Sequence, residues 1–171
     1  MAGKDCTKSL ARRITLQLDS NSVSAESVFC NIKDLNSKLP IELPAINYSK
    51  VNTRDYKFVY GANIHKKPFS IVKINVNDPE ESWEFKYDRD GREYLPTEPV
   101  FVENPNAQSE DDGVLLVMCL AEDNDYLSIL DAKNLTEIGR AELPSDSVPE
   151  ARGTFTFHGF FADSQNFKAL N

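Results

Sequence analysis

The feature that most constrains the fold of this chain is an alternation of polar and apolar residues with a period of two, which recurs along much of its length. Successive side chains of an extended strand point to opposite faces, so this period is typical of a half-buried β-strand. Residues 13–18, 71–76 and 83–87 alternate in this way, and the polar stretch 77–82 separates the last two. The pattern predicts a strand at 13–18 and an antiparallel hairpin over 71–87.

The second half of the chain predicts a meander of three strands. The apolar run 114–120 has the length and the aliphatic content of a central strand. Residues 126–130 and 137–143 follow it as strand candidates, each after a short polar turn. Three consecutive strands joined by short loops resemble most of one blade of a β-propeller.

Over the whole chain, about ten strands at a spacing of roughly 8–12 residues indicate an all-β sandwich, barrel or propeller. The sequence contains no convincing long amphipathic helix, and the weak candidate at 164–170 is expected to be frayed. The polar stretches 21–38 and 49–55 are long for a small closed domain. We interpret them as irregular connections that cross a larger body.

Charge and the terminal sequence exclude several classes of protein. The 171 residues contain 19 Lys+Arg against 27 Asp+Glu, a formal net charge of -8. This balance argues against a nucleic-acid binder and against docking on anionic lipid by charge alone. The N-terminus has no apolar stretch of signal-peptide length, and the longest apolar run, 114–121, is far shorter than the ~20 residues that span a bilayer. We therefore expect a cytoplasmic protein.

Common catalytic and metal-binding motifs are missing from the sequence. The three cysteines form no Cys-x-x-Cys pair, and Cys119, inside the apolar run, is predicted to be a small buried hydrophobe. No Gly-rich phosphate loop, nucleophile elbow or His-Glu-x-x-His helix occurs. The acidic run Glu110-Asp111-Asp112 lacks the ligand spacing of a calcium loop, so we interpret it as a solvated turn.

The two histidines stand in different surroundings. His65 lies in a polar loop beside two lysines, and we interpret it as a solvated loop residue. His158 lies in the aromatic-rich stretch 154–161, where we expect a strand and an imidazole that is at least partly buried. A buried imidazole needs a partner for each ring nitrogen, so His158 is either a hydrogen-bonded core residue or a ligand.

Two glutamates have unusual apolar neighbours. Glu42 lies in Leu-Pro-Ile-Glu-Leu-Pro, and Glu98 lies in Leu-Pro-Thr-Glu-Pro-Val. One interpretation is an edge-strand glutamate that points to water, because burial of a carboxylate without a partner is costly. The alternative is a carboxylate that holds and orients a metal-bound imidazole. The sequence leaves both open.

These segments resemble, in order and in spacing, the C-terminal part of the carotenoid cleavage oxygenases, and in particular the animal carotene oxygenases and the retinoid isomerohydrolase of the eye. The resemblance extends from about Arg12 to Phe161. The segments that carry it are 42–48, 56–61, 98–102, 110–116, 130–137, 140–144 and 157–161.

The resemblance implies a seven-bladed β-propeller with one non-haem ferrous iron, Fe(2+), held by four histidines. Three of those imidazoles are held by glutamates, and the reaction is the cleavage of a carotenoid or retinoid polyene by dioxygen to apocarotenals or retinal. His158 matches the last iron ligand of the family. Glu42 and Glu98 match two of the glutamates that hold ligand imidazoles, and Phe157 is expected to line the substrate tunnel.

The other three histidine ligands of the family have no match here, since His65 does not fall at a ligand position. We therefore expect residues 12–171 to be a C-terminal portion of the propeller, with about two to three blades, that is inactive without the missing blades. Residues 1–11 are expected to be an unrelated leader. Contact with a membrane is expected only through regions outside this chain. The alternatives are a non-catalytic retinoid- or carotenoid-binding or interaction protein of the same family and, more distantly, a β-sandwich interaction module.

Overall fold

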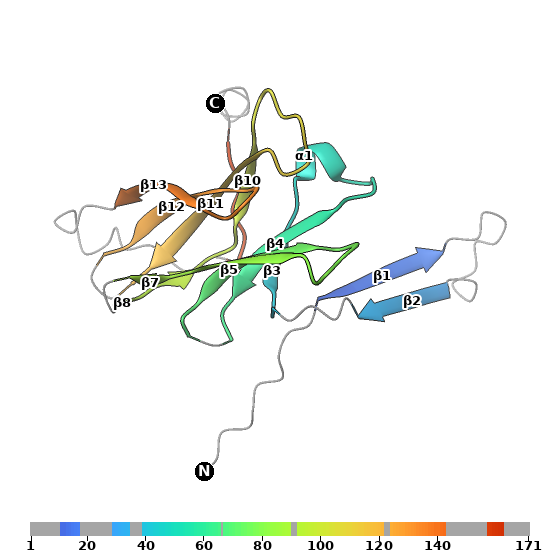
Figure 1. The fold of residues 1–171 in the computed structure, drawn as a ribbon, viewed down its shortest axis with the longest axis horizontal. Coiled ribbons are helices and arrows are strands. Elements are labelled where there is room, and N and C mark those ends of the chain that lie inside the picture. The colour runs from blue at the N-terminus through green and yellow to red at the C-terminus, as the bar shows by residue number, and fades with distance from the viewer. Residues whose placement is uncertain are drawn as a thin grey trace, which may run out of the picture.

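The computed structural model describes residues 11–17, 29–34, 39–65, 67–89, 92–121, 124–142 and 157–162. Within these ranges the regular secondary structure is almost entirely antiparallel strand (Figure 1). Two sheets of four and five strands form the body, and their strands follow each other in chain order. The fold is that of a partial β-propeller, as the sequence predicts.

The first sheet is a four-stranded meander in the order β3-β4-β5-β6. It consists of β3 (Glu42–Ala45), β4 (Phe58–Asn63), β5 (Ser70–Asn75) and β6 (Ser82–Lys86). The predicted hairpin is confirmed, since β5 and β6 pair antiparallel with Ser70 opposite Lys86 and Ile74 opposite Ser82. Every residue of β4 and β5 is buried, because apolar clusters cover both faces of this pair.

The second sheet contains the predicted meander. Its strands are β9 (Leu95–Pro96), β10 (Val100–Glu103), β11 (Gly113–Leu120), β12 (Tyr126–Asp131) and β13 (Glu137–Glu142). The long strand β11 is central, as predicted, with β9 and β10 on one side and β12 on the other. Burial alternates along it, and Leu115, Val117 and Cys119 are fully buried. One face of this sheet therefore faces the core.

The remaining elements are short. β1 (Arg12–Gln17) and β2 (Phe29–Asp34) form a hairpin beyond the first sheet, β7 (Asp88–Arg89) pairs with β8 (Arg92–Glu93), and α1 spans Tyr48–Val51 (Figure 1). The strand predicted at 13–18 is confirmed as β1.

The predicted irregular connections are wrong in part. Stretch 21–38 contains β2, and stretch 49–55 begins inside α1. In β2 polar and apolar residues alternate only over 30–33, within a polar stretch, which is too short to distinguish from a loop. The helix candidate at 164–170 lies outside the described residues, and no described helix is longer than α1.

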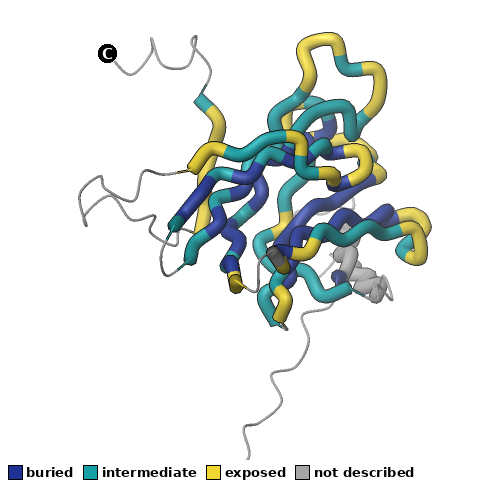
Figure 2. Tube along the Cα trace, turned by 60° about the vertical axis from the view of Figure 1, so that its left-hand side comes forward, coloured by how far each residue is buried: buried dark blue, intermediate teal, exposed yellow. Residues whose placement is uncertain are grey.

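The two sheets share one core. Buried residues of β4 and β5 pack in one cluster with buried residues of β11 and β12. Figure 2 shows the buried residues, in dark blue, gathered inside the body of the molecule. The Tyr60 ring packs on Phe101 with centroids 5.5 Å apart, and the Tyr60 hydroxyl donates to the Ala132 carbonyl at 3.2 Å. Burial of apolar area at about 25 cal/mol per Å² stabilises this contact between the sheets.

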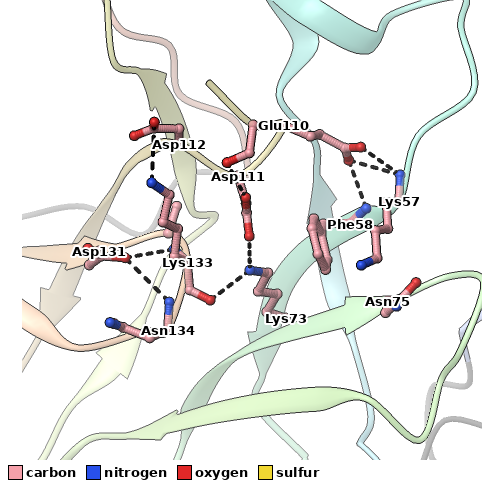
Figure 3. A network of polar contacts seen from close by, with 12 residues as sticks. Lys57, Phe58, Lys73, Asn75, Glu110, Asp111, Asp112, Asp131, Lys133 and Asn134 are labelled. Atoms are coloured by element: carbon pink, nitrogen blue, oxygen red, sulfur yellow. Dashed lines mark hydrogen bonds and ion pairs between the residues drawn. The ribbon is translucent and has the colours of Figure 1, made fainter. Parts of the chain in front are cut away.

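A buried ion pair crosses the same contact (Figure 3). The Lys73 side chain on β5 is 1% exposed, and its Nζ lies 2.7 Å from Asp111 Oδ2, in the loop before β11. The ammonium also donates to the Lys133 carbonyl at 2.7 Å and lies 4.0 Å from the Phe58 ring centroid and 4.6 Å from that of Trp83. Burial lowers the pKa of Lys73, and Asp111 opposes that shift. These contacts offset the cost of removing the charge from water.

The acidic run is thus not the solvated turn that the sequence suggested. The Glu110 carboxylate accepts the backbone N–H groups of Lys57, at 2.8 Å, and of Phe58, also at 2.8 Å, at the start of β4. Asp111 holds Lys73, and Asp112 Oδ2 lies 3.2 Å from Lys133 Nζ (Figure 3). Two of three consecutive carboxylates therefore connect the second sheet to the first.

Loss of one partner of the buried pair is expected to destabilise the protein strongly. Lys73→Met and Asp111→Ala should each lower the free energy of unfolding by about 3–5 kcal/mol, because each leaves a charge without its counter-charge. The double variant should lose less than the sum of the two. Urea denaturation of the native polypeptide measures all three values. Lys86→Met, which removes a lysine that is 57% exposed, is the control and should cost less than about 1 kcal/mol. Additive losses in the double variant would contradict the coupling.

Cys119 is expected to be inert in the folded protein. It is fully buried, as predicted, and burial raises the pKa of its thiol to about 12. Since the thiolate is the reactive form, iodoacetamide at pH 8 should leave Cys119 unmodified in buffer and modify it in urea. Peptide mapping by mass spectrometry reads this residue separately from the other cysteines. Equal labelling in both conditions would contradict the buried position.

Candidate functional site

Glu98 and His158 lie together, although 60 residues separate them in the chain. Glu98 Oε1 lies 3.2 Å from His158 Nδ1, and Glu98 Oε2 accepts the backbone N–H of Gly159 at 3.0 Å. The Glu98 side chain is 15% exposed, whereas the His158 side chain is 84% exposed. The Glu98 carboxylate therefore holds both the His158 ring and the backbone of the segment 157–162. The other ring nitrogen of His158, Nε2, is not part of this contact with Glu98.

The exposure of His158 corrects an expectation from the sequence. Residues 158–162 have no regular secondary structure, and His158 is exposed rather than partly buried. Its contact with Glu98 lies on one edge of the ring, and Gly159 lies near Val100. The aromatic residues of this segment suggested a buried strand. In the structure Phe160 and Phe161 lie on the surface, 77% and 51% exposed.

The position of Glu98 follows from an irregularity in the second sheet. Pro96 lies opposite Cys119 and Val100 lies opposite Leu116, so the chain advances four residues where β11 advances three. An extra residue of this kind bends the strand and re-aims a side chain. Pro96, Thr97 and Pro99 around it are buried, and the Thr97 N–H donates to the Met118 carbonyl at 2.9 Å. Glu98 is therefore held on a rigid base.

Glu42 and His65 form a second carboxylate–imidazole pair. Glu42 Oε1 lies 3.2 Å from His65 Nε2, and the two side chains are 40% and 20% exposed. His65 is therefore not the solvated loop residue that its neighbours suggested, since its ring is mostly covered. Its loop follows β4, so the strand order brings it back beside Glu42 on β3.

The surroundings of Glu42 repeat those of Glu98. Glu42 lies opposite Ala62 and Ala45 lies opposite Tyr60, so β3 advances three residues where β4 advances two. Glu42 lies on β3, the first strand of its sheet, and Glu98 lies between β9 and β10, the first two strands of the other sheet. Each glutamate is thus at a one-residue irregularity near the start of its sheet, and each contacts a histidine. Neither of the two interpretations of these glutamates predicted this repetition.

An open groove of about 930 Å³ lies beside the Glu98–His158 pair. Residues 44–49 form one wall and residues 98–105 the other, and residues 159–161 close one side. Its lining is mainly proline, aliphatic and aromatic side chains, with Glu98 and Glu103 among them. Such a groove suits an apolar ligand.

Hydrogen bonds hold the two walls of the groove together. The side-chain amide of Asn47, at the N-cap of α1, donates to Glu103 Oε1 at 3.1 Å and to the Glu110 carbonyl at 3.0 Å. Asn47 is 1% exposed, so these bonds connect the first sheet to the second inside the protein.

Phe157 lies outside the lining of this groove and is 69% exposed. The aromatic residues that do line it are Tyr48, Phe101, Phe160 and Phe161. The role of Phe157 in a substrate tunnel stays a prediction.

The donors for a metal are incomplete among the described residues. In that part of the chain, no three His, Cys, Asp or Glu side chains converge to hold a metal ion. Taken alone, these residues fit one imidazole ligand with its supporting carboxylate and not a whole metal centre. The described ranges contain no helix with the length and hydropathy needed to cross a membrane.

Comparison with known proteins identifies the family. The family model described as retinal pigment epithelial membrane protein matches residues 2–163. The match includes most of the segment expected to be an unrelated leader, whose boundary at residue 11 stays a prediction. The carotenoid-cleaving dioxygenase, mitochondrial, of Mustela putorius furo is 38% identical over 134 residues, which are 75% of this chain and 23% of that protein.

Solved structures agree on the fold. An ACO/RPE65 chimera is 25% identical with a TM-score of 0.58, over 67% of this chain and 25% of that one. Cobalt-substituted Synechocystis ACO is 23% identical, also with a TM-score of 0.58, over 67% and 25% of the two chains. The chain thus spans about a quarter of the length of these relatives, in their C-terminal part. It belongs to the retinal pigment epithelial membrane protein family, the family of the carotenoid cleavage oxygenases.

Proposed function

We propose that this chain supplies one imidazole ligand, and the carboxylate that holds it, to the non-haem iron centre of a carotenoid cleavage dioxygenase. Such an enzyme splits a polyene double bond with dioxygen. The observation that carries the proposal is the Glu98 carboxylate, which contacts Nδ1 of His158 at 3.2 Å and so turns Nε2 outward. His158 is then the ligand, Glu98 its support, and Glu42 the support of a second ligand imidazole.

The chemistry of these residues suits the proposal. A neutral imidazole is a good ligand for ferrous iron, which when bound would supply the activation of dioxygen. A carboxylate that accepts the other ring N–H fixes the tautomer and the orientation of the ligand. Glu98 also accepts the Gly159 N–H, so it fixes the backbone that carries the ring. Its contribution is therefore to hold His158 ready for the metal.

The apolar groove supports a polyene as the substrate class. A carotenoid or a retinoid is long and apolar, and the groove offers proline, aliphatic and aromatic side chains beside the Glu98–His158 pair. We assign Phe160 and Phe161 to the wall that covers the polyene and excludes water. Phe157, next to His158, is proposed to contact the same substrate from outside the groove.

In this proposal the described residues supply one of the four histidine ligands that the family resemblance implies, and no three His, Cys, Asp or Glu side chains converge among them. We therefore expect the 171-residue chain to have no cleavage activity without further ligands and blades. The cytoplasmic location stays a prediction, and the similar protein of Mustela putorius furo carries the word mitochondrial in its name.

A non-catalytic retinoid- or carotenoid-binding protein is the second candidate. The groove favours it, because binding of an apolar ligand needs the groove and not the metal. The iron content of the purified native polypeptide distinguishes the two candidates, because only the dioxygenase needs bound iron.

Glu98→Ala is expected to release the segment 157–162. The Gly159 N–H loses a charged acceptor, whose hydrogen bond contributes roughly 1.5–3 kcal/mol. The exchange of this amide should become about 10-fold faster or more, as read by hydrogen–deuterium exchange. Glu93→Ala, at an exposed position, is the control and should change nothing at Gly159. Unchanged exchange in Glu98→Ala would contradict the contact.

In the native polypeptide, His158→Ala is expected to abolish tight iron binding and the cleavage of β-carotene. Glu98→Gln should lower iron affinity about 10–100-fold, because a neutral amide holds and orients the ligand ring more weakly than a carboxylate does. Iron per chain is measured by metal analysis, and cleavage by chromatography of the products. Asn77→Ala, in an exposed turn, is the control. A His158→Ala variant with full iron content would contradict the ligand assignment. A native polypeptide that binds β-carotene without iron would favour the second candidate.

A further inference from the structure

We propose that His65 is a positioning residue that holds the Glu42 carboxylate where it can orient a metal-bound imidazole. The proposal deepens the proposed function and rests on it, because Glu42 has this role only in an iron centre. Neither the alternation of the sequence nor the resemblance to the family gave His65 a function. The assignment comes from the contact of its ring with Glu42 and from the backbone around that contact.

In the contact between His65 and Glu42, the imidazole is more buried than the carboxylate. His65 Nε2 lies 3.2 Å from Glu42 Oε1, and the imidazole is 20% exposed while the glutamate is 40% exposed. The less exposed imidazole can therefore hold the more exposed carboxylate in one position. The buried Asn63, at the end of β4, accepts the backbone N–H of His65 through Oδ1 at 3.4 Å. This weak bond ties the loop of His65 to the strand.

The backbone around Glu42 has an irregular conformation that fixes the position of its side chain. Leu43 has a φ of 50°, a left-handed conformation that is strained for a leucine. It lies in the one-residue irregularity between β3 and β4, which re-aims side chains. Opposite, a Cβ on Gly61 would lie 2.7 Å from the Glu42 carbonyl oxygen and 2.3 Å from Ile41 Cγ1. Strand β3 therefore approaches β4 more closely than any side chain at Gly61 would allow.

Comparison with the second pair separates the roles of the two histidines. His158 contacts Glu98 through Nδ1 and is 84% exposed, so its Nε2 faces outward. His65 uses Nε2 itself for Glu42 and is mostly covered. His158 thus has the geometry of a metal ligand, whereas His65 has the geometry of a residue that positions the Glu42 carboxylate. An ionised carboxylate has about four acceptor positions, so a bond from His65 leaves capacity for a ligand imidazole.

The test is the affinity of the native polypeptide for Fe(2+), measured without oxygen by competition with a chelator, so that no turnover is needed. Glu42→Ala should lower this affinity about 10–100-fold. His65→Ala should lower it roughly 3–10-fold, because the carboxylate remains but is less well placed. His65→Gln should restore part of the loss, since its amide N–H can donate to Glu42. In the Glu42→Ala background, His65→Ala should change nothing further.

Lys67→Ala is the matched control, since it alters the same loop at an exposed residue that pairs with Glu93. It should leave the affinity for iron unchanged, and thermal melting of each variant checks that the fold is intact. If Glu42→Ala weakens iron binding and His65→Ala does not, the positioning role is wrong while the proposed function stands. Additive effects of the two substitutions would also overturn it. If Glu42→Ala leaves the affinity unchanged, the role of Glu42 in the proposed function fails as well.

Discussion

The buried ammonium of Lys73 is the interaction on which the arrangement of the two sheets depends. It extends from β5 across the shared core to Asp111 and to the Lys133 carbonyl, in a space bounded by the rings of Phe58 and Trp83. A charge in such surroundings is tolerated only when every one of these partners is in place. The position of the second sheet relative to the first is therefore set by directional contacts, in addition to the apolar burial around them.

The candidate site depends on that arrangement. The walls of the groove come from different sheets, and Asn47 connects them by its bonds to Glu103 and to the Glu110 carbonyl. Glu42 and Glu98 stand at matching irregularities of the two sheets, as expected where successive blades repeat one plan. Each carboxylate then meets a histidine from a later part of the chain. The repeated blade thus places two similar pairs that have different exposure and, in our proposal, different roles.

The strands could be predicted from the sequence wherever the alternation was long or the apolar run continuous, as in β5, β6 and β11. The short β2 was missed, because an alternation of only four residues inside a polar stretch carries little signal. The partner of Glu98 could be anticipated only through the resemblance to a family. The partners of Glu42, Lys73 and Asp111 could not, because no local pattern encodes a contact between residues 23 or 38 positions apart. The alternation itself put Lys73 at a polar position between Val72 and Ile74, where a solvent-exposed lysine is expected, so nothing local indicated that it is buried.

The most direct test of the account is an anomalous diffraction measurement at the iron edge on crystals of the native polypeptide grown with Fe(2+). We expect a single strong anomalous peak within bonding distance of His158 Nε2, with Glu98 still in contact with Nδ1. An iron peak at another place, or a His158 ring that contacts Glu98 while no metal lies near it, would contradict the claim that this pair belongs to an iron centre.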